Sequence, residues 1–292
     1  MHVLEERIDT HCPRIIDVMA NKAEASSLGT VARVALLLKV LAEAGGDMQL
    51  ARVAGQLNLA ASSTHRLLGL LVDCGLAKRG KQPDSYRPGF EFVRLAGLVL
   101  AGSDDLIELA TDFMKNVVDA TEETCVLSVY MPREHKCMVG KVINGPHPLR
   151  YESQIYRVSP LPFGATGKGI LAFLPDSVIT EVLAGGDVSP ITGKPVADSP
   201  SLRRELMRFR KQGYAITRSQ RTAGAVGISA PVFDRNGNVL GALCLTIPET
   251  RFDDRKERSL ADVVMRQSHR ISAALGFSRG HTDDDIARAG RA

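Results

Sequence analysis

Residues 50–73 read LARVAGQLNLAASSTHRLLGLLVD. Within them, Leu50, Val53 and Leu57 recur at intervals of three and four residues, which is the spacing of one buried face of an α-helix. A second helix is predicted from Ser62 to the end of the stretch, because hydroxyl residues favour a helix N-terminus. Only a short connection separates the two segments, so the pair is predicted to form a helix-turn-helix.

Two further patterns flank this pair. Upstream, apolar residues repeat at helical spacing from Thr30 until the Gly45-Gly46 pair, which predicts a preceding helix. Downstream, residues 76–78 and 86–87 are predicted as short strands joined by the polar turn 80–85. The hairpin has basic flanks, and a wing beside a helix-turn-helix is therefore expected.

The second half of the chain alternates between strand and helix patterns. A connector with two predicted helices, 90–99 and 106–120, leads into it. Further strands are predicted over 125–130, 137–142, 149–155, 214–217, 226–233 and 239–247, and further helices over 166–174, 178–183, 201–212 and 255–275. The Asn236-Gly237 step between the last two strands is a hairpin signal. We therefore predict an antiparallel sheet flanked by helices, of the α+β class.

Composition places the chain among ordinary folded proteins. Of its 292 residues, 44% are hydrophobic and 24% are charged. The net charge is +4, and residues 29–103 alone hold nine basic against five acidic residues, so the positive balance gathers around the predicted helix-turn-helix. No apolar run approaches the roughly 20 residues of a spanning helix. Acidic residues occupy the start of the chain where a signal peptide is apolar, so a cytoplasmic protein is expected.

Motifs for catalysis and metal binding are incomplete. The five cysteines are odd in number and widely spaced, and the seven histidines form no ligand pattern, so neither a metal nor a cofactor is expected. Residues 164–169 lack the first glycine and the final Ser or Thr of a phosphate-binding loop. Residues 227–231 lack the closing glycine of a nucleophile elbow, and residues 234–245 lack the glycine and glutamate of a calcium loop. An enzyme is not expected.

Three sets of residues together resemble the IclR family of bacterial transcriptional regulators. They are GTVAR at 29–33 with SSTHRLLGLL at 62–71, PLPFGATGKGILA at 160–172, and GYA at 213–215 with GISAPV at 227–232. The resemblance covers about residues 28–277. It implies a winged helix-turn-helix, a linker helix and a GAF-like α/β effector-binding domain, assembled as a homodimer or homotetramer.

The resemblance also suggests where the domains begin and end. We predict a mobile N-terminal extension over 1–27, the winged helix-turn-helix over 28–89, the linker helix over 90–106, the effector-binding domain over 107–277 and a disordered tail over 278–292. The linker is apolar at Phe92, Leu95, Leu98 and Val99, which either pair two subunits or pack within one chain.

The predicted contacts with double-stranded operator DNA come from the second helix of the pair and from the wing. A helix N-terminus attracts phosphate, while His and Arg side chains reach base edges in the major groove. Basic wing residues add phosphate or minor-groove contacts. The residues predicted to bind DNA are Arg33, Ser62, Ser63, Thr64, His65, Arg66, Lys78, Arg79, Lys81 and Arg87. A capping role for Ser62 or Ser63 is compatible with this, and any one of the basic residues is equally well a solvated charge.

The predicted effector site lies where a helix begins with small side chains. Residues that match the family's pocket are Gly164, Ala165, Thr166, Thr217, Arg218, Arg221, Gly227, Cys244 and Thr246. Many relatives have an acidic cluster near 217–221, where this chain has two arginines. If Arg218 or Arg221 faces inward, an organic or aromatic acid is the expected effector. If both face solvent, the class of ligand stays open.

The sequence thus predicts a DNA-binding transcriptional regulator whose operator affinity is controlled by a small molecule. Two alternatives make different predictions. A small-molecule enzyme with an appended DNA-binding domain requires a nucleophile or base in the pocket, and the motifs supply neither. A DNA-binding architectural protein without a ligand predicts no cavity behind Gly164.

Overall fold

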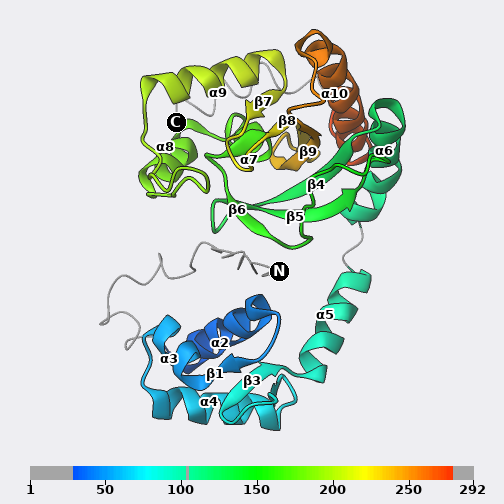
Figure 1. Ribbon diagram of the computed structural model, residues 1–292. Helices are drawn as coiled ribbons and strands as arrows, with labels where there is room; N and C mark the ends of the chain where they lie inside the picture. The colour runs from blue at the N-terminus through cyan, green and yellow to red at the C-terminus, as the bar shows by residue number, and fades with distance from the viewer. Residues whose placement is uncertain (1–28, 103–104, 279–292) are drawn as a thin grey trace, which may run out of the picture. The chain divides into compact units, whose positions relative to one another are not determined.

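The computed structural model describes residues 29–102 and 105–278 (Figure 1). The chain divides into two compact units between Ser103 and Asp104. Helix α5 (Phe90–Gly102) therefore closes the first unit, and α6 (Asp105–Thr121) opens the second, although we expected the linker to run to residue 106. The predicted N-terminal extension lies outside the described residues, as does all but the first residue of the predicted tail.

The first unit packs three helices against a small antiparallel sheet. The helices are α2 (Thr30–Ala44), α3 (Leu50–Leu57) and α4 (Ala61–Asp73), and the strands are β1 (Met48–Gln49), β2 (Ala77–Arg79) and β3 (Ser85–Pro88), in the order β1-β3-β2. The helix periodicity predicts this core correctly, because Leu41 and Leu68 are fully buried. Tyr86 fills the remaining space from the sheet and is also fully buried. Strand β1 was not predicted, because two residues carry no alternation.

The second unit is built on a six-stranded antiparallel sheet in the order β6-β5-β4-β9-β8-β7. The strands are β4 (Thr124–Met131), β5 (Lys136–Ile143), β6 (Val158–Pro160), β7 (Ala215–Arg218), β8 (Ala225–Phe233) and β9 (Val239–Pro248). The helices after α6 are α7 (Gly164–Leu171), α8 (Asp176–Ala184), α9 (Pro200–Gln212) and α10 (Glu257–Ala274), with a short 3-10 helix at Asp254–Lys256. The observed fold is the predicted α+β class.

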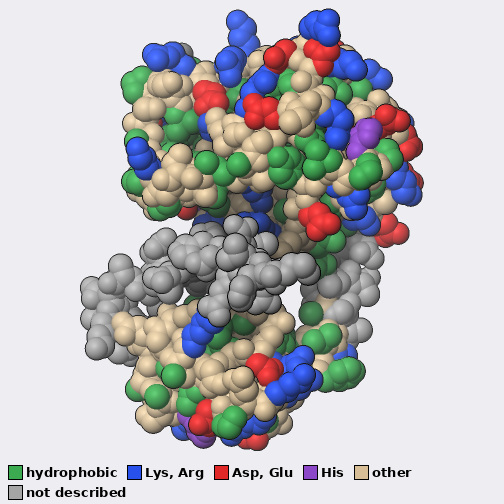
Figure 2. All heavy atoms as spheres, in the orientation of Figure 1, with side chains coloured by type: hydrophobic (Ala, Val, Ile, Leu, Met, Phe, Trp, Pro, Cys, Tyr) green, Lys and Arg blue, Asp and Glu red, His purple; other side chains and the backbone are tan. Residues whose placement is uncertain are grey.

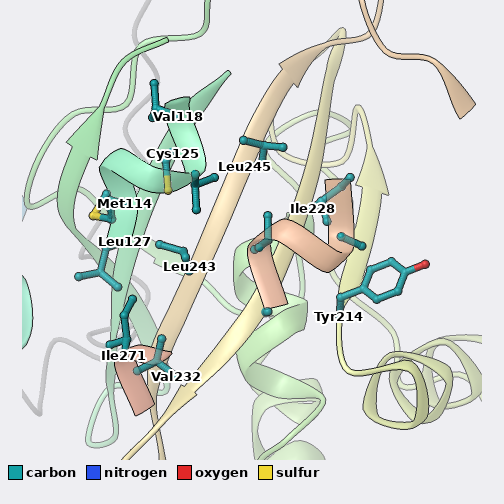
Figure 3. Close-up of a cluster of buried hydrophobic side chains, with 14 of the residues drawn as sticks. Met114, Val118, Cys125, Leu127, Tyr214, Ile228, Val232, Leu243, Leu245 and Ile271 are labelled. Carbon is teal, nitrogen blue, oxygen red and sulfur yellow. The ribbon is translucent and has the colours of Figure 1, made fainter. Parts of the chain in front are cut away.

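Strand alternation separates the two faces of this sheet. On one face, Leu127, Ile228 and Leu245 pack against Met114 of α6 and Ile271 of α10 (Figure 3). The opposite face receives α7, with α8 and α9 contributing to a second cluster of buried apolar side chains. Alternate residues of β8 and β9 therefore point toward α7, and this sets the position of the cavity described below.

Two local predictions were wrong. Residues 149–155 are not a strand; they form an irregular loop, and the short edge strand β6 follows at Val158. Leu149 and Ile155 are 64% and 49% exposed, so the alternation that suggested a strand has no buried face. The start of α4 also differs, because the helix begins at Ala61 and not at Ser62, and the N-cap residue Ala60 makes no side-chain hydrogen bond.

Close packing of α7 on its surroundings yields a stability prediction. A Cβ atom at Gly167 would lie 2.4 Å from the carbonyl oxygen of Leu161, whereas one at Gly55 of α3 would meet nothing within 4 Å. Gly167→Ala is expected to lower the free energy of unfolding by roughly 1–3 kcal/mol through overpacking. Gly55→Ala is expected to raise it by up to about 1 kcal/mol through helix propensity. Urea and thermal unfolding measure both variants; equal effects of the two would contradict the tight α7 packing.

Candidate DNA-binding surface and effector cavity

Helix α4 presents part of its predicted contact set to solvent. Ser62, His65 and Arg66 are exposed on its outer face, and Ser63 is half-buried. Thr64 is fully buried, and its hydroxyl donates a hydrogen bond of 3.0 Å to the carbonyl oxygen of Ala60. The prediction that the Thr64 side chain contacts DNA is therefore wrong, because this residue lies on the inner face of the helix with the core leucines.

The start of α4 carries the electrostatic features expected of a phosphate site. Its first N–H groups have no partner within the helix, and they lie at the positive end of the helix dipole. Because Ala60 is the N-cap residue and makes no side-chain hydrogen bond, the hydroxyls of Ser62 and Ser63 are not used as caps. These hydroxyls are therefore available for other contacts.

The wing is held in place by its own polar contacts. Asp47 accepts a hydrogen bond of 2.7 Å from the backbone N–H of Lys81, and its carboxylate lies 3.7 Å from the guanidinium of Arg87. Arg79 donates to the Tyr86 hydroxyl at 2.6 Å and lies over the Tyr86 ring. These contacts fix the hairpin relative to the sheet while its basic side chains remain at least partly exposed.

The remaining predicted contacts differ in exposure. Lys78, Arg79 and Lys81 are exposed, whereas Arg33 and Arg87 are half-buried. The wing therefore offers a more accessible set of cations than the start of α2.

A cavity of about 90 Å³ lies in the second unit at the start of α7. One water molecule needs roughly 10–15 Å³ by this measure, so the space holds a small organic molecule or several waters. The lining residues are Val126, Val139, Tyr151, Glu152, Ser153, Gln154, Arg157, Gly164, Ala165, Thr166, Thr217, Gln220, Arg221, Thr222, Ala225, Gly227, Cys244 and Thr246. A cavity behind Gly164 is what a ligand-binding regulator requires and what a ligand-free architectural protein does not predict.

Most of the predicted effector residues meet in this cavity. Those that line it are Gly164, Ala165, Thr166, Thr217, Arg221, Gly227, Cys244 and Thr246. Arg218 does not, because it follows Thr217 on β7 and points to the opposite side of the strand. Its guanidinium forms an ion pair with Asp254 and lies 4.8 Å from the centre of the Phe252 ring. The placement of Arg218 in the effector site is therefore wrong.

Arg221 is the one predicted arginine that faces the cavity. A Cβ atom at Gly164, whose φ is +77°, would lie 2.9 Å from the Arg221 Cβ, so a glycine is needed where these residues meet. Within the described part of the chain, no carboxylate lies within ion-pair distance of the Arg221 guanidinium. The half-buried guanidinium of Arg221 therefore has no ion-pair partner among the described residues, although the cavity lining also contains the carboxylate of Glu152 and the guanidinium of Arg157.

Two buried thiols near Arg221 are neutral: Cys244, which lines the cavity, and Cys137, which does not. Burial raises the pKa of Cys244, although hydrogen bonding to Thr166, the nearby Arg221 charge and hydrogen bonding to Thr246 partly lower it. Burial also raises the pKa of Cys137 to about 11, against the opposing effect of Arg221. Both thiols stay protonated near neutral pH, so they do not neutralise the arginine.

Sequence reasoning missed the loop that covers the cavity. Residues 151–154 and Arg157 line it, and the Tyr151 hydroxyl donates a hydrogen bond of 2.8 Å to the carbonyl oxygen of Ala223. Gly224 (φ +70°) makes this contact possible, since a Cβ there would lie 2.7 Å from the Tyr151 oxygen. The loop has no periodic pattern, and its polar cavity residues, Ser153 and Gln154 among them, gave no signal in the sequence.

A second contact ties the same loop to the sheet. Arg251 donates to both oxygens of Glu123, at 2.5 and 2.7 Å, and to the carbonyl oxygen of Leu149 at 3.2 Å. Glu123 is almost fully buried, so this bidentate pair joins the start of β4 to the loop. Hydrogen bonds thus hold the loop at Leu149, through Arg251, and at Tyr151, through Ala223.

The described residues contain neither a cluster of metal ligands nor a helix that could span a membrane. Among residues 29–102 and 105–278, no three His, Cys, Asp or Glu side chains gather where they could hold a metal ion. Over the same residues, no helix has the length and apolarity needed to cross a membrane.

Each of the two units matches a known protein family model. Residues 30–80 match the model of the IclR helix-turn-helix domain, and residues 99–273 match that of the bacterial transcriptional regulator IclR C-terminal domain. The chain belongs to the IclR family of bacterial transcriptional regulators. It is therefore a DNA-binding transcriptional regulator with an effector domain, and the family does not consist of enzymes.

Curated relatives match along most of their length. An HTH-type transcriptional regulator of Mycobacterium tuberculosis is 30% identical over 251 residues, which cover 85% of this chain and 93% of the relative. The transcriptional repressor IclR of Escherichia coli is 23% identical over 243 residues, covering 83% of this chain and 88% of the repressor.

Solved structures share the IclR fold. An IclR transcriptional regulator from Alicyclobacillus acidocaldarius gives a TM-score of 0.73 at 21% identity, covering 86% of this chain and all of the other. An IclR homologue from Microbacterium hydrocarbonoxydans, crystallised with 4-hydroxybenzoate, gives a TM-score of 0.68 at 23% identity, covering 85% of this chain and 99% of the homologue.

The Tyr151 contact predicts how the loop moves. Tyr151→Phe removes one partly exposed hydrogen bond, worth about 0.5–1.5 kcal/mol, without changing the size of the ring. Backbone amides of residues 149–157 are then expected to exchange hydrogen up to about tenfold faster, while those of β8 and β9 do not change. Unaltered exchange in the loop, measured by mass spectrometry, would show that this hydroxyl does not hold it closed.

Proposed function

We propose that this IclR-family regulator reads operator DNA with the outer face of α4 and that a small organic or aromatic acid in the cavity controls its operator affinity. The unpaired guanidinium of Arg221 in the cavity wall is the observation that carries the choice of ligand. The protein acts in the cytoplasm as a homodimer or homotetramer, and this function requires no cofactor.

His65 and Arg66 are the side chains proposed to read bases. Both are exposed in the first two turns of α4, where a recognition helix enters the major groove. Arg is suited to the N7 and O6 atoms of guanine, and Ser62 and Ser63 stand where a phosphate would lie. Lys78, Arg79 and Lys81 of the wing supply salt-dependent contacts with the backbone, to which Arg33 and Arg87 contribute less directly.

The charge balance of the sequence supports the assignment of DNA binding to the first unit, whereas Figure 2 shows basic and acidic side chains interspersed on the visible faces of both units. The first unit has nine basic against five acidic residues between positions 29 and 103. A basic balance on a helix-turn-helix is the electrostatic pattern that DNA binding requires.

The acid class follows from the charges around the cavity. A carboxylate matches the planar guanidinium of Arg221 and offsets the excess of two lining arginines over one lining glutamate. The start of α7 at Gly164 and Ala165 adds backbone N–H groups at the positive end of a helix. Val126 and Val139 form apolar walls, which suit an aliphatic or aromatic body. The IclR homologue crystallised with 4-hydroxybenzoate holds a ligand of this class.

Assembly into at least a dimer follows from the small size of the DNA-binding unit. One helix-turn-helix covers few base pairs, so specific binding uses two units on half-sites about one helical turn apart, or a multiple of that distance. Helix α5 exposes apolar side chains, with Phe90, Val93 and Leu95 78%, 60% and 41% exposed, and we propose that it pairs subunits. The side chains of Leu98 and Val99 lie outside the described residues.

Control by the effector requires two arrangements of the subunits. A ligand shifts the equilibrium only if it binds one arrangement more tightly than the other. Because the coupling is reciprocal, operator DNA must change the affinity for the acid by the same factor as the acid changes the affinity for DNA.

Arg66→Ala tests the proposed reading helix. Loss of a base contact costs about 1–3 kcal/mol, so operator affinity is expected to fall roughly tenfold or more while acid binding is unchanged. Lys39→Ala, which removes an exposed charge from α2, is the matched control and is expected to have a much smaller effect. Fluorescence anisotropy with labelled upstream DNA measures both, and equal affinities for the two variants would exclude Arg66 from base recognition.

Arg221→Ala tests the proposed acid site, with Arg218→Ala as a control that removes the same charge three residues away. Calorimetric titration with benzoate, 4-hydroxybenzoate and pyruvate is expected to show at least tenfold weaker binding to Arg221→Ala and unchanged binding to Arg218→Ala. Benzamide, which lacks the charge, is expected to bind weakly to all three proteins. If both arginine variants bind the acids like the wild type, the ligand is not held by a guanidinium.

A further inference from the structure

The second unit also contains an open surface depression of about 260 Å³ beside the segment that leads into α7, which we call the second cavity. Its walls come from that segment, from α7 and α9, from the connection between α8 and α9, and from the turn after β7. The lining residues are Pro162, Phe163, Lys168, Ser189, Ile191, Thr192, Val196, Leu202, Ser219 and Gln220. Only Gln220 of the described chain also lines the effector cavity.

A buried charged group lies in the wall of this second cavity. The Lys168 side chain is 7% exposed, and its Nζ atom donates to Glu205 Oε2 at 2.6 Å. Within the described residues, Glu205 is the one hydrogen-bond partner of this ammonium, which has three donors. Lys168 thus has donor capacity to spare, although its charge is already balanced.

Two other polar side chains of the wall are committed, whereas Gln220 Oε1 is buried and has no hydrogen-bond partner among the described residues. Ser189 Oγ accepts from the backbone N–H groups of Ile191 and Thr192, at 3.3 and 3.2 Å. Ser219 Oγ accepts from the Gly224 N–H at 2.9 Å and donates to Glu249. The ammonium of Lys168 therefore offers spare donors to a molecule in this space, and Gln220 Oε1 offers a spare acceptor.

The remaining walls are apolar. Phe163, Val196 and Leu202 are partly buried around the space, and Ile191 is 44% exposed at its rim. A ligand that covers Ile191 would remove this apolar surface from water, which is favourable by about 25 cal/mol per Å². An apolar body is therefore the second requirement for a ligand.

We propose that this cavity is a second ligand site, which binds a small neutral molecule with an apolar body and one hydrogen-bond acceptor, such as a ketone or an ester. The acceptor lies against the spare N–H groups of Lys168. A carboxylate is disfavoured because it would compete with Glu205 and would have to lose its hydration without a second cation. The proposal does not depend on the acid class assigned to the Arg221 cavity.

The position of this site gives it access to the effector cavity. Phe163 lines the second cavity, and the next residue, Gly164, lines the first. A second pair of neighbouring residues also connects the two cavities. Gln220 lines both of them, and the next residue, Arg221, lines only the first. A molecule in the second cavity therefore contacts both segments that form the wall of the first.

Three probes of similar shape test the chemistry of the ligand. Cyclohexanone has an acceptor, methylcyclohexane has none, and cyclohexanecarboxylate is an anion. Ligand-detected NMR titrations with the full chain are expected to show that cyclohexanone binds at least fivefold more tightly than the other two. Tighter binding of the carboxylate, or equal binding of all three, would overturn the proposed class.

A pair of tryptophan variants tests the location. Ile191→Trp narrows the cavity from its rim, whereas Val188→Trp alters the same connection at a residue that is 46% exposed and does not line the cavity. Cyclohexanone is expected to bind at least tenfold more weakly to Ile191→Trp and normally to Val188→Trp. Equal affinity for the two variants would place the probe elsewhere and contradict the site. Arg221→Ala is expected to leave cyclohexanone binding unchanged, which separates this result from a failure of the acid site.

The role of Lys168 is tested without leaving a buried charge unpaired. In the double variant Lys168→Met/Glu205→Met both members of the ion pair become apolar. This variant is expected to bind cyclohexanone and methylcyclohexane equally, because the donor is gone and the apolar space remains. Retained preference for the ketone would show that Lys168 does not bind the acceptor.

Discussion

The architecture of the second unit depends on the close approach of α7 to the sheet. Glycines make this approach possible, since a Cβ at Gly169 would lie 2.2 Å from Ser229 Oγ and one at Gly227 would lie 2.8 Å from the Ala165 Cβ. Ser229 adds a buried hydrogen bond to the carbonyl oxygen of Ala165, at 2.7 Å. The first turn of α7 is thereby held over β8 and β9, and its N-terminal end forms one wall of the effector cavity.

The same packing gives two neighbouring cavities different chemistry. The Arg221 cavity has a cation that forms no ion pair within the described residues, and its lining holds two arginines against one carboxylate, so it suits an anion. Across the Phe163-Gly164 step, Lys168 is already paired with Glu205, so its surroundings suit a neutral acceptor. Charge balance within the protein, rather than the mere presence of a basic residue, distinguishes the two sites.

The helices and most strands could be predicted from the sequence, because burial in them is periodic. The family resemblance predicted eight of the eighteen residues that line the effector cavity. Residue spacing in the sequence also argues against two of the predicted site residues, Thr64 and Arg218. Thr64 lies three and four residues before Leu67 and Leu68, so helical spacing places it on the inner face. Arg218 follows Thr217 on a strand, so the two side chains lie on opposite sides. The loop around Tyr151 could not be predicted, because hydrogen bonds between distant segments fix it.

Linkage between acid binding and DNA binding is the central claim for this regulator. The most direct measurement is the affinity of the full chain for its own upstream DNA, by anisotropy, with and without an acid shown by calorimetry to bind the wild type and not Arg221→Ala. We predict that the saturating acid changes operator affinity by at least fivefold in the wild type and not in the variant. An acid that binds at Arg221 while operator affinity stays the same would contradict the account.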